Sequence, residues 1–285
     1  MELKHIATRQ GRLSTFLKNE MGMSTGLMNR LKWQEKIFVN GTPRHNDHTV
    51  QIGDVITAQL DEEAPQYPAE AGDLTILYED EHLLVVDKPS GMLIHPSRAT
   101  MTGTLANRVI YHFQTTGQSC AFHPVTRLDR DTFGITLIAK NSHVHSLLQQ
   151  SDLQKTYYAL VYGGPEENRG EINAPIARKA LPSLLREVRE DGKPSVTEYT
   201  VLERNGMLCK LALRPITGRT HQLRVHCAHM GYPILGDPQY NTADSKALSD
   251  TKGLTAQLLC AKTLEFIHPI TGERMHLTSQ MDTKL

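Results

Sequence analysis

The sequence lacks a long apolar segment and a hydrophobic leader. None of its hydrophobic runs approaches the roughly 20 residues that a helix needs to span a bilayer. The first residues, M-E-L-K-H-I-A-T-R-Q, contain no apolar stretch of the kind found in signal peptides. We therefore expect a protein without membrane contact that stays in the cytoplasm.

Cysteine is scarce and there is no net charge. The four cysteines are widely separated and form no C-x-x-C pair, so the sequence predicts neither a disulfide framework nor a zinc knuckle. The 31 basic residues balance the 31 acidic ones, which argues weakly against nucleic-acid binding because Lys and Arg supply most phosphate affinity. The balance is not uniform, since residues 1–60 hold eight basic residues against five acidic ones. The first part of the chain is mildly basic.

An exposed linker is predicted near residue 65. Residues 62–73, E-E-A-P-Q-Y-P-A-E-A-G-D, combine acidic residues, proline and glycine without apolar periodicity, which is typical of a linker. The chain is thereby divided into a small module of residues 1–61 and a larger domain of residues 74–285.

The small module has the pattern of two short helices followed by a β element. Apolar residues recur at helical spacing in 13–17 and 27–31, a strand at 37–39 runs into the turn pair Asn40-Gly41, and residues 50–58 fit a further strand pair. This order resembles the S-four-like RNA-binding module. The alternative is a small helical domain without RNA contacts. The resemblance implies RNA contacts for Arg12, Arg30 and Lys32.

The larger domain is predicted to be α+β with a mostly antiparallel sheet, because regular alternation of strands and helices is missing. Strands are expected at 74–78, 83–86, 135–139, 157–162, 196–202 and 208–213. Helices are expected at 104–113, 143–150 and 220–229.

The most informative segment is Thr126–Gly134, T-R-L-D-R-D-T-F-G, where Arg127 and Arg130 bracket Asp129. A carboxylate is ionised at neutral pH; burial raises its pKa and a nearby cation opposes that rise. Such a paired carboxylate suits a nucleophile or a base better than an acid. The alternative is a surface turn whose charges have no catalytic role.

Two further segments complete a set. Together with Thr126–Gly134, Lys155-Thr156-Tyr157 and Gly218–His226, G-R-T-H-Q-L-R-V-H, resemble in sequence and order the motifs of the RluA-type pseudouridine synthases. Weaker matches are K-P-S-G-M-L-I-H-P, D-G-K-P-S-V-T-E-Y and Y-P-I-L-G-D-P-Q-Y. Thr126 and Phe133 stand where the family usually has His and Ser. These departures leave the Arg, Asp and Thr of the motif intact and place substrate identity in more doubt than reaction type.

The resemblance implies an enzyme that isomerises uridine to pseudouridine in RNA without a cofactor. Asp129 would be the catalytic carboxylate, either attacking the anomeric carbon or removing a neighbouring sugar proton, and Tyr157 would stack on the uracil. Since neighbouring residues on a strand face opposite sides, only one of Tyr157 and Tyr158 should face the site. Arg224 would pair with Asp129, with Arg219 as the competing candidate. The resemblance further implies RNA contacts for Arg127, Arg130, Lys155, Arg219, His221 and Gln222.

Other functions receive less support. A noncatalytic RNA-binding protein would not need the full Asp, Tyr and Arg set. A glycosidase needs two carboxylates about 5 to 10 Å apart flanking the sugar, which Asp129 and Asp131 cannot easily provide. The spacing of His221, His226 and His229 differs from H-E-x-x-H, so no metal site is predicted. The expected substrate is large-subunit (23S) ribosomal RNA, with transfer RNA as the alternative, and the protein is expected to act as a monomer.

Overall fold

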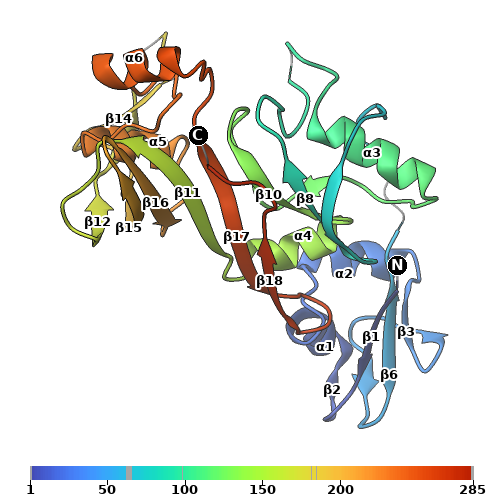
Figure 1. Cartoon of the computed structure of the whole chain (residues 1–285). Coiled ribbons are helices and arrows are strands. Elements are labelled where there is room, and N and C mark those ends of the chain that lie inside the picture. Colours follow the sequence, from blue (N-terminus) through green and yellow to red (C-terminus); the bar gives the residue numbers. More distant parts are fainter. Residues whose placement is uncertain (1, 62–65, 98, 181, 184, 284–285) are drawn as a thin grey trace. The chain divides into compact units, whose positions relative to one another are not determined.

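The computed structural model describes residues 2–61, 66–97, 99–180, 182–183 and 185–283 (Figure 1). It divides the chain into two compact units, Met1–Ala64 and Pro65–Leu285. Of the expected linker, residues 62–65 lie outside the described residues. No helix in the described part of the chain is long and apolar enough to cross a membrane.

The first unit packs two helices against a small antiparallel sheet around one apolar core. The expected helices are confirmed as α1 (Leu13–Asn19) and α2 (Thr25–Trp33). The sheet has the order β1 (Glu2–Ile6), β6 (Val55–Gln59), β3 (Ile37–Val39) and β4 (Thr42–Pro43), and β2 (Gly11–Arg12) pairs separately with β5 (Thr49–Val50).

The N-G turn of this unit is also confirmed. Asn40 and Gly41 both have positive φ, 51° and 76°, which is the backbone that a two-residue hairpin turn requires. Strand β1 was not expected. It pairs with β6, and of its five residues only Leu3 is buried, so the sequence carries little apolar periodicity there.

The second unit is an α+β domain built on a mixed sheet of ten strands in the described part of the chain. The main path has the order β12 (Arg169–Asn173), β15 (Val196–Asn205), β16 (Leu208–Pro215), β11 (Gln154–Tyr162), β17 (Leu259–Ile267), β10 (Phe133–Ala139), β8 (Leu83–Lys88) and β7 (Thr75–Glu79). Strand β18 (Arg274–Thr278) extends the sheet beside β17, and β9 (His123–Pro124) pairs with β10. Strands β13 (Ile176–Arg178) and β14 (Arg186–Val188) form a separate pair. Only β10 and β17 run parallel among the described pairs, so the prediction of a mostly antiparallel sheet is confirmed.

Helices cover two regions of this sheet (Figure 1). Helix α3 (Leu105–Thr115) buries its apolar side against residues of β8 and β10. Helix α5 (Gln222–His229) packs against β11 and β16. Helices α4 (Ser142–Gln149) and α6 (Ala243–Thr251) complete the unit in the described part. The packing of α5 on β11 brings the second and third sequence motifs together, and β17 links β11 to the strand β10 that follows the first.

Candidate active site

The loop that carries Asp129 joins β9 to β10 and is held at both ends. Thr126 Oγ1 accepts a hydrogen bond from the Leu137 amide at 2.9 Å, and the Thr132 amide donates to the Asp129 carbonyl at 3.2 Å. Gln257 Nε2 donates to Thr132 Oγ1 at 3.1 Å. These bonds fix the backbone on either side of Asp129, so its carboxylate has a defined position.

Lys88 supports the same loop from the interior. Its side chain is fully buried, and Nζ donates to the carbonyl oxygens of Pro89, Met92 and Arg130 at 2.9 Å each. Burial lowers the pKa of Lys88 to about 8, against the opposing influence of nearby carboxylates. The K-P-S-G match pointed to this segment, but the sequence alone assigned Lys88 no role.

The Asp129 carboxylate meets Arg224 of helix α5. Arg224 Nη1 donates to Asp129 Oδ2 at 3.1 Å, and His221 Nε2 lies 3.9 Å from the same oxygen. Oδ1 of Asp129 has no hydrogen-bond partner within the described residues. The side chain of Asp129 is 31% exposed while that of Arg224 is only 6% exposed. The carboxylate is therefore accessible and held by a buried cation.

Arg224 is itself held by a second carboxylate, that of Asp237. Nε and Nη2 of Arg224 donate to the two oxygens of Asp237 at 2.7 and 2.9 Å, and Nη2 also donates to Gln239 Oε1 at 2.9 Å. Burial would lower the pKa of Arg224, but the bonds with Asp237 and Asp129 raise it above its ordinary value. Sequence reasoning missed Asp237, although the match Y-P-I-L-G-D-P-Q-Y contained it.

His221 precedes α5 in a left-handed conformation, with φ of 58°. Its Nδ1 lies 2.9 Å from the Tyr240 hydroxyl. Burial lowers the pKa of His221, with Asp129 opposing and Arg224 reinforcing the effect, so the ring is neutral at neutral pH. The site thus presents a neutral imidazole and a guanidinium to one carboxylate.

Tyr157 lies on the face of β11 that α5 covers, packed against the same cluster as Ala159 and Val161. Burial, with the nearby Asp129 carboxylate, raises the pKa of Tyr157 to about 12. Tyr158 takes the other side of the strand, where Lys210 Nζ lies 5.0 Å from its ring centroid and pairs with Asp282. Of the two tyrosines, Tyr157 is the one near Asp129.

Residues 82–229 match the RNA pseudouridylate synthase family. The chain belongs to this family. Its members isomerise uridine in RNA, so the enzyme is an isomerase that acts on RNA.

Relatives extend the match well beyond that range. This pseudouridine synthase is 36% identical to the Uncharacterized RNA pseudouridine synthase YhcT of Bacillus subtilis (strain 168), over 92% of this chain and 86% of the relative. It is 30% identical to the Ribosomal large subunit pseudouridine synthase C of Vibrio cholerae, over 96% of this chain and 90% of the relative. The structure is similar to Human RNA Pseudouridylate Synthase Domain Containing 1, with a TM-score of 0.60, 26% identity, and coverage of 76% of this chain and 94% of that chain. The structural match confirms the predicted α+β fold and shows that it is the pseudouridine synthase fold.

Two arginines of the synthase's first motif differ in their surroundings. Arg127 is exposed and has no ion-pair or hydrogen-bond partner among the described residues. Arg130 is also exposed, and it forms two hydrogen bonds with Asp131 at 2.9 and 3.1 Å. Asp131 therefore pairs with Arg130 and not with Arg127. This leaves the Arg127 guanidinium available to a substrate.

The other residues that are expected to contact RNA lie on β11, before α5 and in the first unit. Lys155 precedes Tyr157 on β11, and burial lowers its pKa. Arg219 is exposed, with Nε donating to the Pro194 carbonyl at 3.2 Å. In the first unit, Arg12 lies at the start of α1, and Arg30 and Lys32 lie in the last turn of α2, where Lys32 Nζ is 5.0 Å from the ring centroid of the exposed Trp33.

The expectation of an RNA contact for Gln222 needs correction. Gln222 is 4% exposed. Its amide nitrogen donates to Val196 O and Thr197 Oγ1, and its amide oxygen accepts from Thr217 Oγ1 and the Arg219 amide, all at 2.8–3.0 Å. Because the amide is fully used inside the protein, Gln222 fixes the start of α5 and has no free group for RNA.

The histidines of the third motif do not converge on a metal. His226 is buried, with Nδ1 2.9 Å from Thr197 Oγ1 and Nε2 3.0 Å from the Ala174 carbonyl. Within the described residues, no group of three or more His, Cys, Asp or Glu could hold a metal ion.

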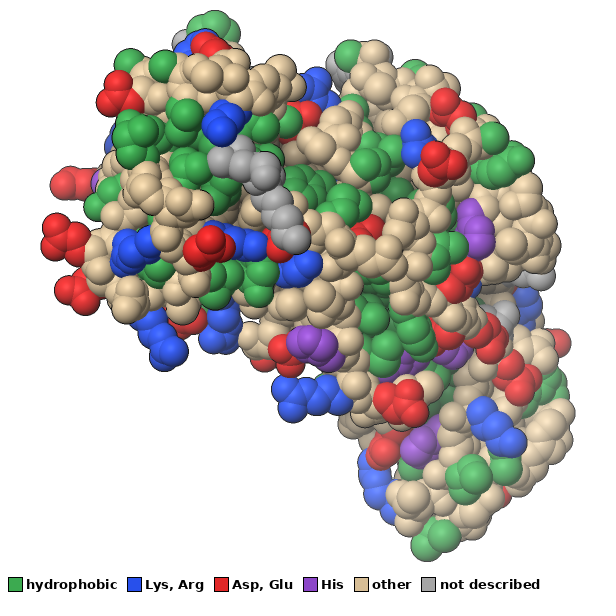
Figure 2. Space-filling view, in the orientation of Figure 1, with side chains coloured by type: hydrophobic (Ala, Val, Ile, Leu, Met, Phe, Trp, Pro, Cys, Tyr) green, Lys and Arg blue, Asp and Glu red, His purple; other side chains and the backbone are tan. Residues whose placement is uncertain are grey.

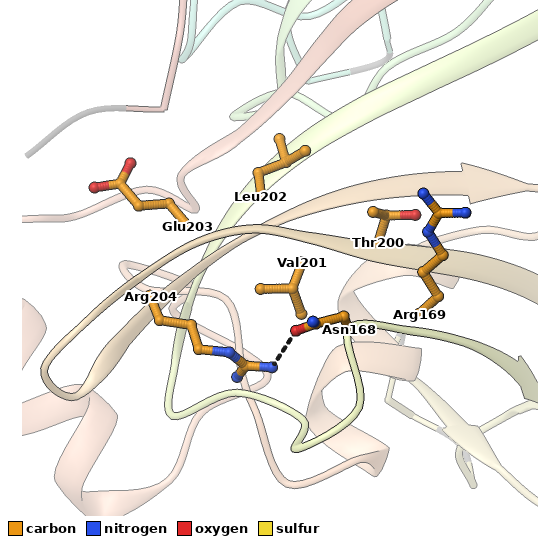
Figure 3. Close-up of a pocket in the computed structure, with 7 residues that line it drawn as sticks. All are labelled: Asn168, Arg169, Thr200, Val201, Leu202, Glu203 and Arg204. Carbon is orange, nitrogen blue, oxygen red and sulfur yellow. Dashed lines mark hydrogen bonds between the residues drawn. The ribbon is translucent and has the colours of Figure 1, made fainter.

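Outside the site, basic and acidic side chains are interspersed on the synthase surface. On the face drawn in Figure 2, blue Lys and Arg side chains gather over β12, β15 and β16, but red Asp and Glu side chains lie among them. A pocket of about 550 Å³ opens on strands β12 and β15 (Figure 3). It is lined by Asn168, Arg169, Thr200, Val201, Leu202, Glu203 and Arg204. Arg204 Nη2 donates to Asn168 Oδ1 at 3.2 Å, and no lining residue belongs to the Asp129 site.

Proposed function

We propose that this synthase isomerises uridines of large-subunit ribosomal RNA, with Asp129 as the catalytic carboxylate, Tyr157 beneath the uracil and Arg224 as the partner of Asp129. The observation that carries the assignment is the 3.1 Å bond between Arg224 Nη1 and a partly exposed Asp129 carboxylate, beside Tyr157. The name of the Vibrio cholerae relative supports ribosomal RNA as the substrate. Transfer RNA is the alternative.

The reaction exchanges one bond to the sugar for another. The bond between C1′ and N1 of uridine breaks and leaves its electron pair on the uracil, which rotates and bonds to C1′ through C5. The proton on C5 is then lost and N1 gains one, so no external oxidant or reductant is needed. Asp129 acts either by attacking C1′ or by removing a neighbouring sugar proton, and both routes require an ionised carboxylate.

Tyr157 and Arg127 serve the substrate rather than the bond exchange. The uridine must leave its stack to reach Asp129, which costs a few kcal/mol, and an aromatic ring under the base returns about 1 to 3 kcal/mol. A planar ring also permits the detached uracil to turn. The Arg127 guanidinium has no partner in the described part of the chain. Arg127 lies two residues before Asp129. It would either fill the space that the extruded nucleotide leaves in the base stack or contact the phosphates beside that space.

The first unit would act as an S-four-like RNA-binding module. The alignment with the Vibrio cholerae relative spans 96% of this chain, so it includes most of that unit. Its exposed Arg12 and Arg30, and Lys32 beside the exposed Trp33, provide cations and a stacking surface. Such groups suit phosphates and unpaired bases.

Asp129→Asn tests the catalytic assignment. The substitution keeps the shape of the side chain and removes its charge, so we expect turnover to be abolished while RNA affinity stays nearly unchanged. Release of tritium from RNA labelled at C5 of uridine measures turnover. Asp131→Asn is the matched control in the same loop, because Asp131 pairs with the exposed Arg130. Appreciable turnover by Asp129→Asn would remove Asp129 from the mechanism.

The substrate is tested in cells. Pseudouridines are mapped in total RNA from cells with the gene, without it, and with the Asp129→Asn variant. We expect defined sites in large-subunit ribosomal RNA to be lost in the last two strains. Loss of sites only in transfer RNA would overturn the ribosomal assignment and leave the reaction type intact.

A further inference from the structure

The two donors at Asp129 approach the same oxygen. Arg224 Nη1 and His221 Nε2 both face Oδ2, at 3.1 and 3.9 Å, while Oδ1 has no partner in the described part of the chain. We propose that Asp237 and Tyr240 are positioning residues of the reaction, which aim these two donors at Oδ2 and so leave Oδ1 as the oxygen that reacts with the sugar. This inference rests on the proposed role of Asp129.

Asp237 fixes the plane of the Arg224 guanidinium. The Asp237 side chain is fully buried, and its Oδ1 accepts from the backbone amides of Gln239 and Tyr240 at 2.9 and 3.0 Å. With Nε and Nη2 of Arg224 bonded to Asp237, and Nη2 also to Gln239, only Nη1 remains to face Asp129. Because the guanidinium is planar and these bonds fix its orientation, Nη1 can donate only in the direction of Asp129.

The negative charge of Asp237 changes how Arg224 interacts with Asp129. Because the buried pair of Arg224 and Asp237 is already neutral as a unit, Arg224 acts on Asp129 mainly as a directed hydrogen-bond donor and less as a net positive charge. The ring of Tyr240 lies against the guanidinium, 5.0 Å from Cζ to the ring centroid, and stabilises the same orientation. Asp129 therefore keeps more of its reactivity than it would beside an unpaired arginine.

Tyr240 sets the tautomer of His221. The amide of Arg186 donates to the Tyr240 oxygen at 2.8 Å, which directs the hydroxyl proton to His221 Nδ1 at 2.9 Å. Burial raises the pKa of Tyr240, so the hydroxyl keeps its proton. Since Nδ1 accepts, the proton of the neutral ring lies on Nε2, on the side of Asp129.

The backbone of His221 supports this assignment. Glu35, Asn40 and His221 are the non-glycine residues with positive φ in the described part of the chain, and only His221 belongs to the second unit. A left-handed residue of this kind is kept only where its surroundings hold it. The separation of 3.9 Å between His221 Nε2 and Asp129 Oδ2 is too long for a hydrogen bond, but catalytic contacts often shorten when substrate binds.

The consequence concerns which atom forms the new bond. In the route by attack, Asp129 Oδ1 bonds to C1′ while the electron pair of the C1′–N1 bond leaves on the uracil, and the Oδ1–C1′ bond breaks back to the carboxylate when C5 bonds to C1′. In the route by proton removal, Oδ1 accepts the neighbouring sugar proton, the C–H electron pair forms a double bond to C1′ as the uracil leaves, and the proton returns to the sugar when C5 bonds to C1′. In both, Oδ2 keeps its hydrogen bond from Arg224 and stays beside His221, so the carboxylate does not have to rotate.

The test uses the full chain and single-turnover rates with excess enzyme on tritium-labelled total RNA from cells that lack the gene. We expect Asp237→Asn to lower the rate about 100-fold or more, as for a misplaced catalytic group, and Tyr240→Phe about 10-fold, with RNA affinity nearly unchanged. Tyr232→Phe and Asp282→Asn are the matched controls. Tyr232 packs in the apolar cluster under α5 and Asp282 pairs with Lys210, so both should retain the wild-type rate.

A spectroscopic measurement separates positioning from general damage. Nitrogen-15 NMR of labelled histidine, assigned with His221→Gln, should show the Nε2–H tautomer of His221 in the wild type and a mixture of tautomers in Tyr240→Phe. An Nδ1–H tautomer in the wild type would overturn the inference. The inference would also be overturned if Tyr240→Phe and folded Asp237→Asn kept wild-type rates while Asp129→Asn was inactive. Activity of Asp129→Asn would instead overturn the proposed function. If Asp237→Asn does not fold, the inference is tested by the rate of Tyr240→Phe and by the tautomer of His221.

Discussion

At the residue scale, Asp129 and Asp237 contact the same guanidinium and yet have opposite exposures, 31% and 0% of the side chain. The exposed carboxylate keeps one oxygen without a partner in the described part of the chain, whereas both oxygens of the buried one are used. A buried charge is retained only where it is paired and hydrogen-bonded. Asp237 meets that condition, and its burial is what makes Arg224 rigid.

Three substitutions test which tyrosine faces the base. Tyr157→Phe keeps the stacking ring, and because the pKa of Tyr157 is raised to about 12 the removed hydroxyl is not a ready proton donor or acceptor at neutral pH. We therefore expect Tyr157→Phe to retain most turnover. Tyr157→Ala should lose the stacking energy of about 1 to 3 kcal/mol, which is roughly a 5- to 150-fold loss. RNA binding and turnover are measured separately.

Tyr158→Ala is the control for the Tyr157 series. Its ring lies against Lys210 on the other side of β11, so its removal should act through packing and leave the turnover of the folded protein close to wild type. A larger loss of turnover in Tyr158→Ala than in Tyr157→Ala would show that the wrong tyrosine has been assigned to the uracil.

The burial of the His143 imidazole leads us to expect that the protein loses stability in acid. It is 4% exposed, its Nε2 has no hydrogen-bond partner in the described part of the chain, and burial lowers its pKa from 6.5 to about 4. Between these two values the unfolded chain binds a proton that the folded chain does not, so the free energy of unfolding falls as pH decreases from 6.5 to 4. The loss from this group amounts to about 3 kcal/mol.

The measurement compares wild type with His143→Leu by urea unfolding at a series of pH values. Leucine cannot titrate, so the difference in unfolding free energy between the two proteins should shift in favour of the variant as pH decreases through that window and stay constant above it. A difference that does not change with pH would mean that His143 titrates normally in the folded protein.

Candidate site residues could be selected from the sequence only where they lie in a motif. Asp129, Tyr157 and Arg224 come from the three segments, and the structure brings these residues together. Lys88, Asp237 and Tyr240 were seen only as parts of weaker matches. Their roles depend on burial and on bonds to partners far away in sequence, such as the bond from Lys88 to the Arg130 carbonyl, and neither is visible before the chain is folded.

At the scale of elements, the position of the loop that carries Asp129 depends on how β10 begins. Strands β10 and β17 run parallel only at Phe133–Gly134 and Cys260–Ala261. A Cβ on Gly134 would lie 2.4 Å from the Ala261 carbonyl oxygen, and the φ of Gly134 is +107°. Both the space and the backbone therefore require glycine at the point where the loop of Asp129 joins the sheet.

Gly134→Ala should destabilise the second unit by about 3 kcal/mol or more, because the clash is with backbone that cannot turn away. Gly206→Ala is the matched control. Its φ is +58° and nothing lies within 4 Å of the added Cβ, so it should cost only about 1 to 2 kcal/mol for the left-handed backbone. Urea unfolding measures both. Equal losses would show that the approach of β17 is not the cause.

The elements themselves were largely predictable, and their partners were not. The expected strands and helices of residues 74–229 are all present, because apolar periodicity and length identify them locally. Strand β17, which joins β10 to β11, and strand β1 were missed, as were β2, β9, β12, β13, β14, β18 and helix α6. In β1 only Leu3 is buried, and the position of β17 follows from pairing with strands far away in sequence, which no local pattern reveals.

At the scale of the whole molecule, the net charge of zero does not describe the surface that RNA would meet. Positive and negative side chains are mixed on the face in Figure 2, so affinity has to come from particular cations and not from a general field. Eight basic residues against five acidic ones in residues 1–60 make the first unit a candidate source of such cations.

Deleting residues 1–61 should weaken RNA binding and leave the catalytic step intact, because the described contacts of Asp129, Arg224 and His221 are made by residues of the second unit. Every phosphate that a Lys or Arg neutralises adds about 0.7 to 0.9 to the slope of log affinity against log salt, so the truncated protein should have a flatter slope. Single-turnover rates at saturating enzyme should equal those of the full chain. A full-length variant with Arg12, Arg30 and Lys32 changed to Gln is the control that keeps the unit folded, and it should reproduce the lower affinity and the flatter slope. Unchanged affinity and an unchanged slope in both proteins would show that the first unit does not hold RNA.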